Sequence, residues 1–204
     1  IFLEKILFKI SDHVIFISKQ VKKYFKKEIF FQEKKNSIIY YGVDSVVKID
    51  NKKVTKLRKN LKDNKNQKII LCIARHSPQK KINFLLKGYQ LFYKKNNNSK
   101  LIIVGKGKLS DELKKYAFKL NITRKVKWIS FTDNIHELLK ITDVFCLTSD
   151  YEGLGLVLLE ALQMKVPIIT INKSAMKEVV KDNYNGILLD NNSNHNNLCE
   201  KLLI

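Results

Sequence analysis

Short apolar runs alternate with amphipathic segments over most of this chain. Residues 69–74 are continuously apolar, as a strand covered on both faces by helices should be. Residues 83–93 then place Phe84, Leu85, Tyr89 and Phe92 at helical spacing, and the same alternation continues toward the end of the chain. Strands that alternate with helices of this length predict an α/β fold built on a parallel, doubly wound sheet.

The individual elements are expected where the periodicity changes. We expect strands at residues 13–17, 37–41, 69–74, 100–104, 126–129, 144–147, 167–171 and 186–189. We expect helices at residues 18–27, 83–93, 110–120, 134–140, 156–164, 175–180 and 194–203, and residues 2–10 also have helical spacing. Ser18 and Ser110 are the expected N-caps of their helices, because a serine hydroxyl accepts a free backbone N–H at that position.

A polar segment divides the chain. Residues 50–68 are rich in Lys and Asn, which favours a loop with a short helix at a domain junction. The chain begins at Ile1 rather than Met and ends inside the last expected helix, so we expect a fragment of a longer protein. The predicted parts are residues 1–45, the remnant of an amino-terminal domain, a linker at 46–68, and a ligand-binding domain at 69–204 with a shortened last helix.

The chain is strongly basic. It carries 39 Lys and Arg against 19 Asp and Glu, a formal charge of +20, which favours anionic partners. Basic residues gather at 19–27, 48–68 and 94–100, without the interleaved aromatic side chains of a single-strand stacking platform. We interpret most of this charge as solvated surface, with an anionic membrane as the next alternative and no nucleic-acid partner.

Cysteine and histidine spacing argues against a metal or disulfide framework. Cys72, Cys146 and Cys199 are isolated, no CxxC pair exists, and the four histidines show no ligand spacing. Reduced cysteines fit a cytoplasmic location. No apolar run approaches the roughly 20 residues of a membrane span, and the start lacks a cleavage-like site.

The segment 148–161 combines features that suit one kind of ligand. An expected strand leads into a turn with Gly153 and Gly155, and a helix follows. Free N–H groups at such a helix start favour an anion, while the flanking carboxylates of Glu152 and Glu160 offer acceptors for hydroxyl groups. The sequence therefore predicts a ligand that carries both phosphate and sugar.

Other candidate residues follow expected strands directly, so they should lie at the same rim of the sheet. Arg75 and Lys80 are two cations suited to a diphosphate, although two ordinary surface cations are the alternative. Gly105 begins a Gly-Lys-Gly turn that either approaches a ligand or is only a tight turn. Glu178 is either a further hydroxyl acceptor or an acid that favours its helix dipole.

Glu152 and Glu160 also suggest the paired acids of a glycosidase. A largely helical segment between them would separate them by up to roughly 12 Å along the axis. That is at or beyond the upper end of the separation that hydrolytic pairs use, roughly 5 to 9.5 Å. We therefore expect the two carboxylates to contact opposite ends of one elongated ligand.

Taken together, these motifs resemble those of family-four retaining glycosyltransferases, the glycosyl transferases group 1 of the GT-B type. The segment from Glu152 to Ala161 is similar to their E-x7-E signature. Further matches, in order and spacing, are Tyr41-Gly-Val-Asp44, the Arg75 and Lys80 pair, the strand and turn 101–107, Pro167, and 178–186. The resemblance implies the carboxyl-terminal, Rossmann-like donor-binding half of that fold, preceded by the tail of the amino-terminal Rossmann domain.

The resemblance also implies roles for single residues. Arg75 and Lys80 would bind the donor diphosphate, and with Glu152 they make up the expected catalytic set. Glu152 would contact the sugar and Glu160 the ribose. The expected donor-binding residues are Arg75, Lys80, Gly105, Glu152, Gly153, Leu154, Gly155, Leu156 and Glu160, with residues 153–156 acting through their backbone N–H groups. No cofactor or metal is implied, because the nucleotide sugar is itself a substrate.

This chain departs from the family pattern at several positions. Thr148 stands where proline is usual, Lys81 where glycine often follows the lysine, and Lys165 where glycine normally ends the motif helix. Ser174 and Ala175 replace a pair of glycines that usually approaches the phosphates. Three of these departures therefore remove a glycine from a turn.

Three functions are compatible with these observations. The first is a retaining hexosyltransferase that uses a UDP- or GDP-linked sugar and a cell-surface glycan or lipid-linked acceptor. The second is a truncated, non-catalytic chain that binds nucleotide sugar only. The third is a basic module bound peripherally at the inner face of the membrane, which is compatible with the first.

Overall fold

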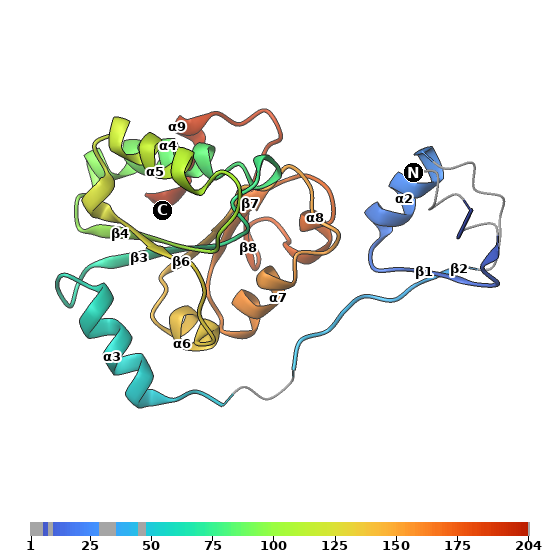
Figure 1. Cartoon of the computed structure of the whole chain (residues 1–204), viewed down its shortest axis with the longest axis horizontal. Helices are drawn as coiled ribbons and strands as arrows, with labels where there is room; N and C mark the ends of the chain where they lie inside the picture. The colour runs from blue at the N-terminus through green and yellow to red at the C-terminus, as the bar shows by residue number, and fades with distance from the viewer. Residues whose placement is uncertain (1–5, 8–9, 29–35, 45–47, 204) are drawn as a thin grey trace.

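The computed structural model of the chain describes residues 6–7, 10–28, 36–44 and 48–203. The helical spacing expected over residues 2–10 falls largely outside these ranges. The main body is one sheet with helices on both faces, and a smaller amino-terminal part lies beside it (Figure 1). The predicted α/β class is confirmed.

The main sheet has six strands, and every neighbouring pair is parallel. The strands are β3 (Lys68–Ile73), β4 (Ser99–Val104), β5 (Val126–Ile129), β6 (Val144–Leu147), β7 (Ile168–Ile171) and β8 (Gly186–Leu189). Their order across the sheet is β5-β4-β3-β6-β7-β8. The chain thus runs outward from β3 in one direction, then returns to the other side of β3, which makes β3 and β6 the switch point of a doubly wound sheet.

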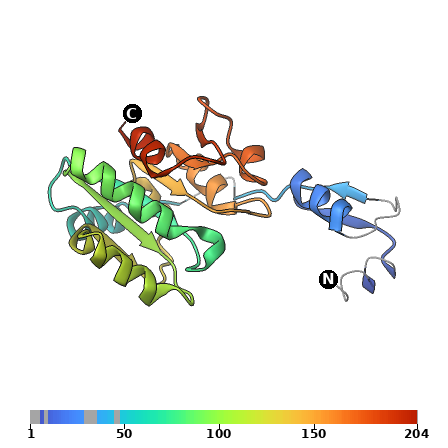
Figure 2. The same ribbon diagram turned by 90° about the horizontal axis from the view of Figure 1, so that it is seen from above.

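Helices cover the sheet in two layers (Figures 1 and 2). The first layer holds α4 (Ile82–Lys95), α5 (Ser110–Lys119) and α9 (His195–Leu202), with α9 packed along α4. The second layer holds α3 (Asn51–Leu61), α6 (Ile135–Lys140) and α7 (Leu156–Gln163), with α3 packed on α6. The short helix α8 (Met176–Val179) contacts α7 and β7. Two 3-10 turns, η1 (Pro78–Lys80) and η2 (Thr123–Lys125), precede α4 and β5.

The continuously apolar strands form the core, because helices exclude water from both faces of the sheet. Ile69, Leu71, Leu101, Ile102 and Ile103 are completely buried. All three cysteines are buried and unpaired. Burial raises the pKa of the Cys72 thiol to about 12, so this side chain behaves as a small apolar group.

The segment predicted as a linker contributes a helix to the main domain. Val54 and Leu61 of α3 are buried in the same core as the sheet. Asp50 caps α3 by accepting the backbone N–H groups of Lys52 and Lys53, and its own N–H donates to the buried Glu137 of α6. Few apolar residues mark this helix in the sequence, because most of its surface faces water.

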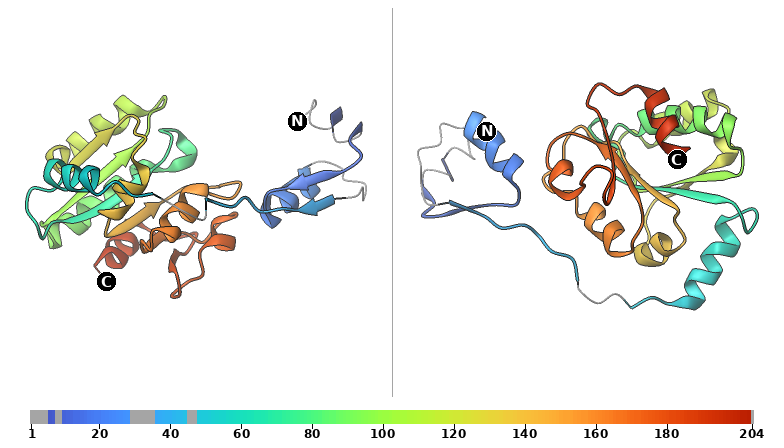
Figure 3. Two further views of the ribbon diagram at one scale, coloured as in Figure 1. Left: turned by 90° about the horizontal axis from the view of Figure 1, so that it is seen from below. Right: turned by 180° about the vertical axis from the view of Figure 1, so that it is seen from behind.

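The amino-terminal part contains β1 (Val14–Phe16), α2 (Lys19–Glu28) and β2 (Asn36–Ile38), with β1 and β2 paired in parallel. Between β2 and α3, the described residues 39–44 and 48–50 belong to no helix or strand (Figure 3). The predicted N-cap Ser18 is confirmed, since its hydroxyl accepts the N–H of Val21. The expected extension of the second strand to Tyr41 is wrong, because the strand pairing ends where β1 ends.

Three positions that depart from the family's glycines keep a left-handed backbone. The φ angles are 46° at Lys81, 57° at Lys165 and 53° at Ser174. A left-handed conformation costs an L-residue roughly 1–2 kcal/mol, because its Cβ approaches a carbonyl oxygen. The fold therefore imposes the turn geometry even where the sequence no longer supplies glycine.

Replacing Lys165 by glycine should stabilise the domain. Lys165 is exposed and follows the end of α7, where Val166 N–H still donates to Ala161. Lys165→Gly should raise the free energy of unfolding by about 1 kcal/mol, since relief of strain exceeds the added chain entropy. Urea unfolding followed by circular dichroism measures this change.

The matched control is Lys115→Gly, at an exposed position inside α5. This substitution should lower stability by about 1 kcal/mol, because glycine is a poor helix former where φ is already negative. A loss of stability in both variants would contradict the assignment of strain to Lys165.

Candidate functional site

A pocket opens at the carboxyl ends of the central strands, at the switch point of the sheet. Its volume is about 500 Å³. The lining residues come from the loops after four strands: Ile73, Ala74, Arg75, Lys80, Val104, Gly105, Ser130, Phe131, Thr132, Ile135, Glu152, Gly155, Leu156 and Val157. Open α/β sheets bind ligands at this place because loops leave the two central strands in opposite directions and form a crevice.

An ion pair between two of these loops lies at the centre of the pocket. Lys80 Nζ is 2.5 Å from Glu152 Oε1, and both side chains are largely buried. The hydroxyl of Ser149 donates to the same oxygen at 2.6 Å. The pair therefore joins the loop after β3 to the loop after β6.

Backbone contacts reinforce the same junction. The hydroxyl of Thr148 donates to the carbonyls of Lys80 and Lys81, at 3.2 and 3.1 Å. The N–H of Asp150 donates to the carbonyl of Gln79 at 2.8 Å. Proline, usual in the family at the Thr148 position, could make neither hydroxyl bond. Thr148 thus ties η1 to the motif loop through its hydroxyl group.

Arg75 supplies the second cation of the pocket. Among the described residues, no carboxylate oxygen lies within 4.0 Å of its guanidinium, whereas Lys80 is paired. Its charge is therefore available for an anion, and its planar fork suits two oxygens of one phosphate. The pocket combines an uncompensated arginine with a lysine–glutamate pair.

Ser174 holds the backbone of Glu152 in place. Its hydroxyl donates to the Glu152 carbonyl at 2.8 Å and accepts the Glu152 N–H at 3.3 Å. This serine stands where the family pattern has glycine, and its backbone is left-handed. The substitution therefore keeps the turn and adds two hydrogen bonds that a glycine lacks.

Three expected donor-binding residues do not line the pocket. Gly153 faces the amino-terminal part, since an added Cβ would lie 2.9 Å from Ile17 Cδ1. The side chain of Leu154 is buried in the protein interior. Glu160 lies further along α7, where burial raises the pKa of its carboxyl group. The remaining six, Arg75, Lys80, Gly105, Glu152, Gly155 and Leu156, are brought together.

The loop after β5 lines the pocket and was missed from the sequence. Ser130, Phe131 and Thr132 belong to it, and the Phe131 side chain is 74% exposed. Their position is the one feature of the sequence that could have indicated this role, because residues that directly follow an expected strand lie at the rim of the sheet. An exposed aromatic ring in the lining of the same pocket as Arg75 offers a flat apolar surface to a ligand.

The Gly-Lys-Gly turn is pressed against the neighbouring strand end. An added Cβ at Gly105 would lie 2.1 Å from the Ala74 carbonyl oxygen, and one at Gly107 would lie 2.4 Å from that of His76. The expected N-cap at Ser110 is wrong: this residue is the first of α5, and its hydroxyl bonds to the turn at Gly107 and to His76 Nδ1. Gly105 is thus required by the packing of the turn and also lines the pocket.

Glu178 lies outside this pocket. Its carboxylate accepts three hydrogen bonds from the amino-terminal part, donated by Lys19 N–H, Gln20 N–H and the Tyr40 hydroxyl. Glu178 lies in the first turn of α8, as one of the two alternatives predicted. Neither alternative anticipated its hydrogen-bond partners, which come from a different part of the fold.

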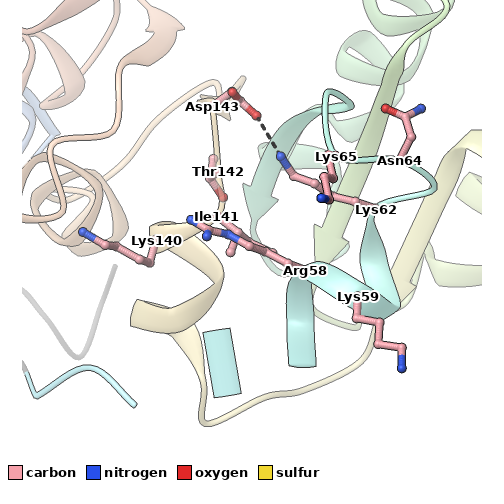
Figure 4. Close-up of a pocket in the computed structure, with 9 residues that line it drawn as sticks. All are labelled: Arg58, Lys59, Lys62, Asn64, Lys65, Lys140, Ile141, Thr142 and Asp143. Atoms are coloured by element: carbon pink, nitrogen blue, oxygen red, sulfur yellow. Dashed lines mark ion pairs between the residues drawn. The ribbon is translucent and has the colours of Figure 1, made fainter. Parts of the chain in front are cut away.

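A larger hollow, of about 800 Å³, lies at the amino ends of the strands, away from the residues described above. Arg58, Lys59, Lys62, Lys65 and Lys140 surround it, together with Asn64, Ile141, Thr142 and Asp143 (Figure 4). Lys62 points at Asp143, Arg58 extends along Ile141, and Lys59 points away. Several of these cations follow the carboxyl ends of α3 and α6, where a positive charge complements the helix dipole.

Within the described ranges, no cluster of three or more His, Cys, Asp or Glu residues is arranged to hold a metal ion. In the same ranges, the helices are all too short or too polar to cross a bilayer.

Comparison with known proteins identifies the class that this fold and pocket define. The family of glycosyl transferases group 1 matches residues 53–203. The chain belongs to this family, and its sheet is the carboxyl-terminal half of a GT-B glycosyltransferase fold.

Two curated relatives show the extent of the match. The chain is 30% identical over 164 residues to the poly(ribitol-phosphate) alpha-N-acetylglucosaminyltransferase of Staphylococcus aureus, covering 80% of this chain and 33% of that protein. It is 29% identical over 193 residues to the UDP-Gal:alpha-D-GlcNAc-diphosphoundecaprenol alpha-1,3-galactosyltransferase of Escherichia coli, covering 90% and 49%. The chain thus spans less than half the length of each relative.

Solved structures share the fold. The Anabaena protein HepE, in complex with UDP-glucose, has a TM-score of 0.84 and 22% identity, over 97% of this chain and 55% of that one. The glycosyltransferase WaaG, involved in lipopolysaccharide biosynthesis, has a TM-score of 0.81 and 18% identity, over 92% and 52%. At these identities the likeness establishes the arrangement of strands and helices.

Substitution of Gly105 tests the close packing of the rim. Gly105→Ala should destabilise the domain by roughly 3 kcal/mol, because the new Cβ meets a backbone oxygen and φ is +138°. Gly42→Ala is the control: no atom lies within 4 Å of the added Cβ, so stability should change by less than about 0.5 kcal/mol. Equal urea midpoints for the two variants would contradict the packing described here.

Proposed function

We propose that this chain is the donor-binding half of a retaining glycosyltransferase whose donor is a UDP-linked hexose or N-acetylhexosamine. The observation that carries the proposal is the convergence of Arg75, Lys80 and Glu152 in one pocket at the switch point of the sheet. Two cations suit a diphosphate, and the adjacent carboxylate suits sugar hydroxyls.

The chemistry assigned to the pocket is electrostatic. As the bond from the sugar to the diphosphate breaks, negative charge grows on the phosphate oxygens, and Arg75 and Lys80 stabilise it. Glu152 orients the sugar by accepting its hydroxyl protons, while its ion pair holds Lys80 beside the phosphate. The free N–H groups at the start of α7, after Gly155, add a partial positive charge.

The choice of nucleotide rests on relatives and on one side chain. HepE has been crystallised with UDP-glucose, and the Escherichia coli relative is named for its UDP-galactose donor. In this chain, Phe131 presents its ring at the pocket that holds Arg75, where a nucleobase can stack on it. Glu160 is assigned to the ribose, one turn of α7 beyond the residues that line the pocket.

The proposed acceptor is a cell-surface glycan or a lipid-linked sugar. Support comes from the names of the two curated relatives, which refer to poly(ribitol-phosphate) and to a diphosphoundecaprenol-linked sugar. A non-catalytic chain that binds the nucleotide sugar without transfer remains the alternative. Release of UDP from UDP-glucose by the 204-residue chain would rule out that alternative.

Calorimetry with UDP tests the donor site. Arg75→Ala and Lys80→Ala should each weaken UDP binding roughly tenfold to a hundredfold, because each removes a charge-assisted contact worth about 1.5–3 kcal/mol. Arg124→Ala, which removes an exposed arginine of η2, is the charge-matched control and should leave the affinity unchanged.

Two results would contradict the assignment. One is an absence of UDP binding to the unsubstituted chain at millimolar concentration. The other is an equal loss of affinity in the Arg75 and Arg124 variants, which would reduce the effect to the overall charge of the protein.

The basic hollow supports a second, compatible proposal: this face rests on an anionic membrane. Its five cations are opposed by one carboxylate, Asp143, which is already engaged by Lys62 and Lys68. Exposed lysine and arginine near an anionic bilayer contribute about 1 kcal/mol each. A lipid-linked acceptor would place the enzyme at such a surface.

Flotation with phosphatidylglycerol vesicles tests this surface. Replacing Arg58 and Lys65 by serine should lower vesicle binding roughly tenfold or more at low salt. Replacing Lys94 and Lys115, which are exposed on α4 and α5, removes the same charge and should have a smaller effect. Binding that is insensitive to 0.5 M salt, or equal losses in both double variants, would contradict a specific electrostatic face.

A further inference from the structure

One carboxylate of the main domain is bonded entirely to the amino-terminal part. Glu178, on α8, accepts the backbone N–H of Lys19 at 3.0 Å and that of Gln20 at 2.8 Å. It also accepts the hydroxyl proton of Tyr40 at 2.7 Å. These donors come from the start of α2 and from the stretch after β2, so one side chain contacts both segments.

The two backbone donors are ones that α2 cannot satisfy by itself. The first N–H groups of a helix have no intrahelical acceptor. Ser18 takes the N–H of Val21 with its own hydroxyl, which leaves those of Lys19 and Gln20. Glu178 accepts both, and its negative charge is favourable at the positive end of the helix dipole.

A second contact lies beside the first. Ile17 Cδ1 lies over Gly153 of the motif loop, 2.9 Å from the position of an added Cβ. Gly153 thus provides the space that the Ile17 side chain occupies. Ser174, which precedes α8, holds the backbone of Glu152 through two hydrogen bonds. The polar and apolar contacts of the amino-terminal part are therefore both made with the segments that build the pocket.

We propose that Glu178 is the anchor by which the amino-terminal part of the chain docks onto the rim of the main domain. The partner surface is the start of α2 together with Tyr40 and Ile17. The docking sets the position of the amino-terminal part beside the loop that carries Glu152. This docking contact needs no bound nucleotide. The proposal therefore holds whether or not the chain binds a nucleotide sugar.

The geometry favours docking over contact with a sugar. Both oxygens of Glu178 are engaged, Oε1 by Gln20 N–H and Oε2 by Lys19 N–H and the Tyr40 hydroxyl. Glu178 is absent from the pocket lining. The hydrogen bond from the Tyr40 hydroxyl to Glu178 raises the pKa of Tyr40, and burial of the phenol is a smaller cause of the same shift.

Amide hydrogen exchange, read residue by residue by NMR on the 204-residue chain, tests the anchor. In the unsubstituted protein, the amides of Lys19 and Gln20 should be protected, although they are the first of their helix. Glu178→Ala should speed their exchange roughly tenfold or more, because it removes charge-assisted hydrogen bonds. Amides of β7, such as those of Ile169 and Thr170, should keep their protection and report that the sheet is folded.

Glu178→Gln provides a milder variant if the alanine variant folds poorly. It keeps the shape but removes the charge, so the pKa of Tyr40 should fall toward its ordinary value in an NMR titration of the tyrosine rings. Glu112→Gln, in the first turn of α5, removes an exposed acid of the same type and should change neither Tyr40 nor the two amides.

Three outcomes would overturn the proposal. The first is unchanged exchange of Lys19 and Gln20 in Glu178→Ala, with the β7 amides still protected. The second is an equal effect of Glu112→Gln. The third is a selective loss of affinity for UDP-glucose over UDP in Glu178→Gln with Tyr40 unchanged, which would make Glu178 a contact of the sugar.

Discussion

The parallel pairing of β3 with both β4 and β6 determines what this protein can bind. Because β3 lies at the switch point, the loop that follows it and the loop that follows β6 leave the sheet toward opposite faces. Arg75 and Lys80 stand on the first loop and Glu152 on the second. The ion pair between Lys80 and Glu152 spans this divide.

Close packing explains why glycine is kept at position 105, whereas a left-handed backbone alone does not exclude other residues. Gly105 is required because the end of β4 approaches the backbone after β3 so closely that a Cβ has no room. At Lys81, Lys165 and Ser174, space is available and only the backbone conformation is unfavourable for an L-residue. Strain of roughly 1–2 kcal/mol can be offset by other contacts, as Ser174 shows with its two bonds to Glu152. By contrast, contacts elsewhere cannot offset the overlap of a Cβ at position 105 with the neighbouring backbone.

The charge of the chain acts on two separate surfaces. At the carboxyl ends of the strands, Lys80 is paired with Glu152, while Arg75 has no carboxylate partner in the described part of the chain, which suits a small, specific anion. At the amino ends, four of the five cations around the hollow are exposed, Lys62 being the exception, and they lie near the ends of two helices, which suits an extended anionic surface. The net charge of +20 reveals neither arrangement. The two arrangements are revealed only by which of these cations are paired with carboxylates.

The sequence by itself determined the fold class and half of the pocket. Strand and helix positions follow from local periodicity, since each element must present its apolar face to one core. Arg75, Lys80, Glu152 and the glycine turns were identifiable because a parallel sheet brings the residues after its strands to one rim. Only the tertiary structure showed that Phe131 lines the pocket, that Gly153 and Glu160 do not, and that α3 belongs to the core. It alone paired Glu178 with Lys19, Gln20 and Tyr40. These are contacts between segments far apart in the chain, where side-chain direction and packing decide the outcome and no local pattern records it.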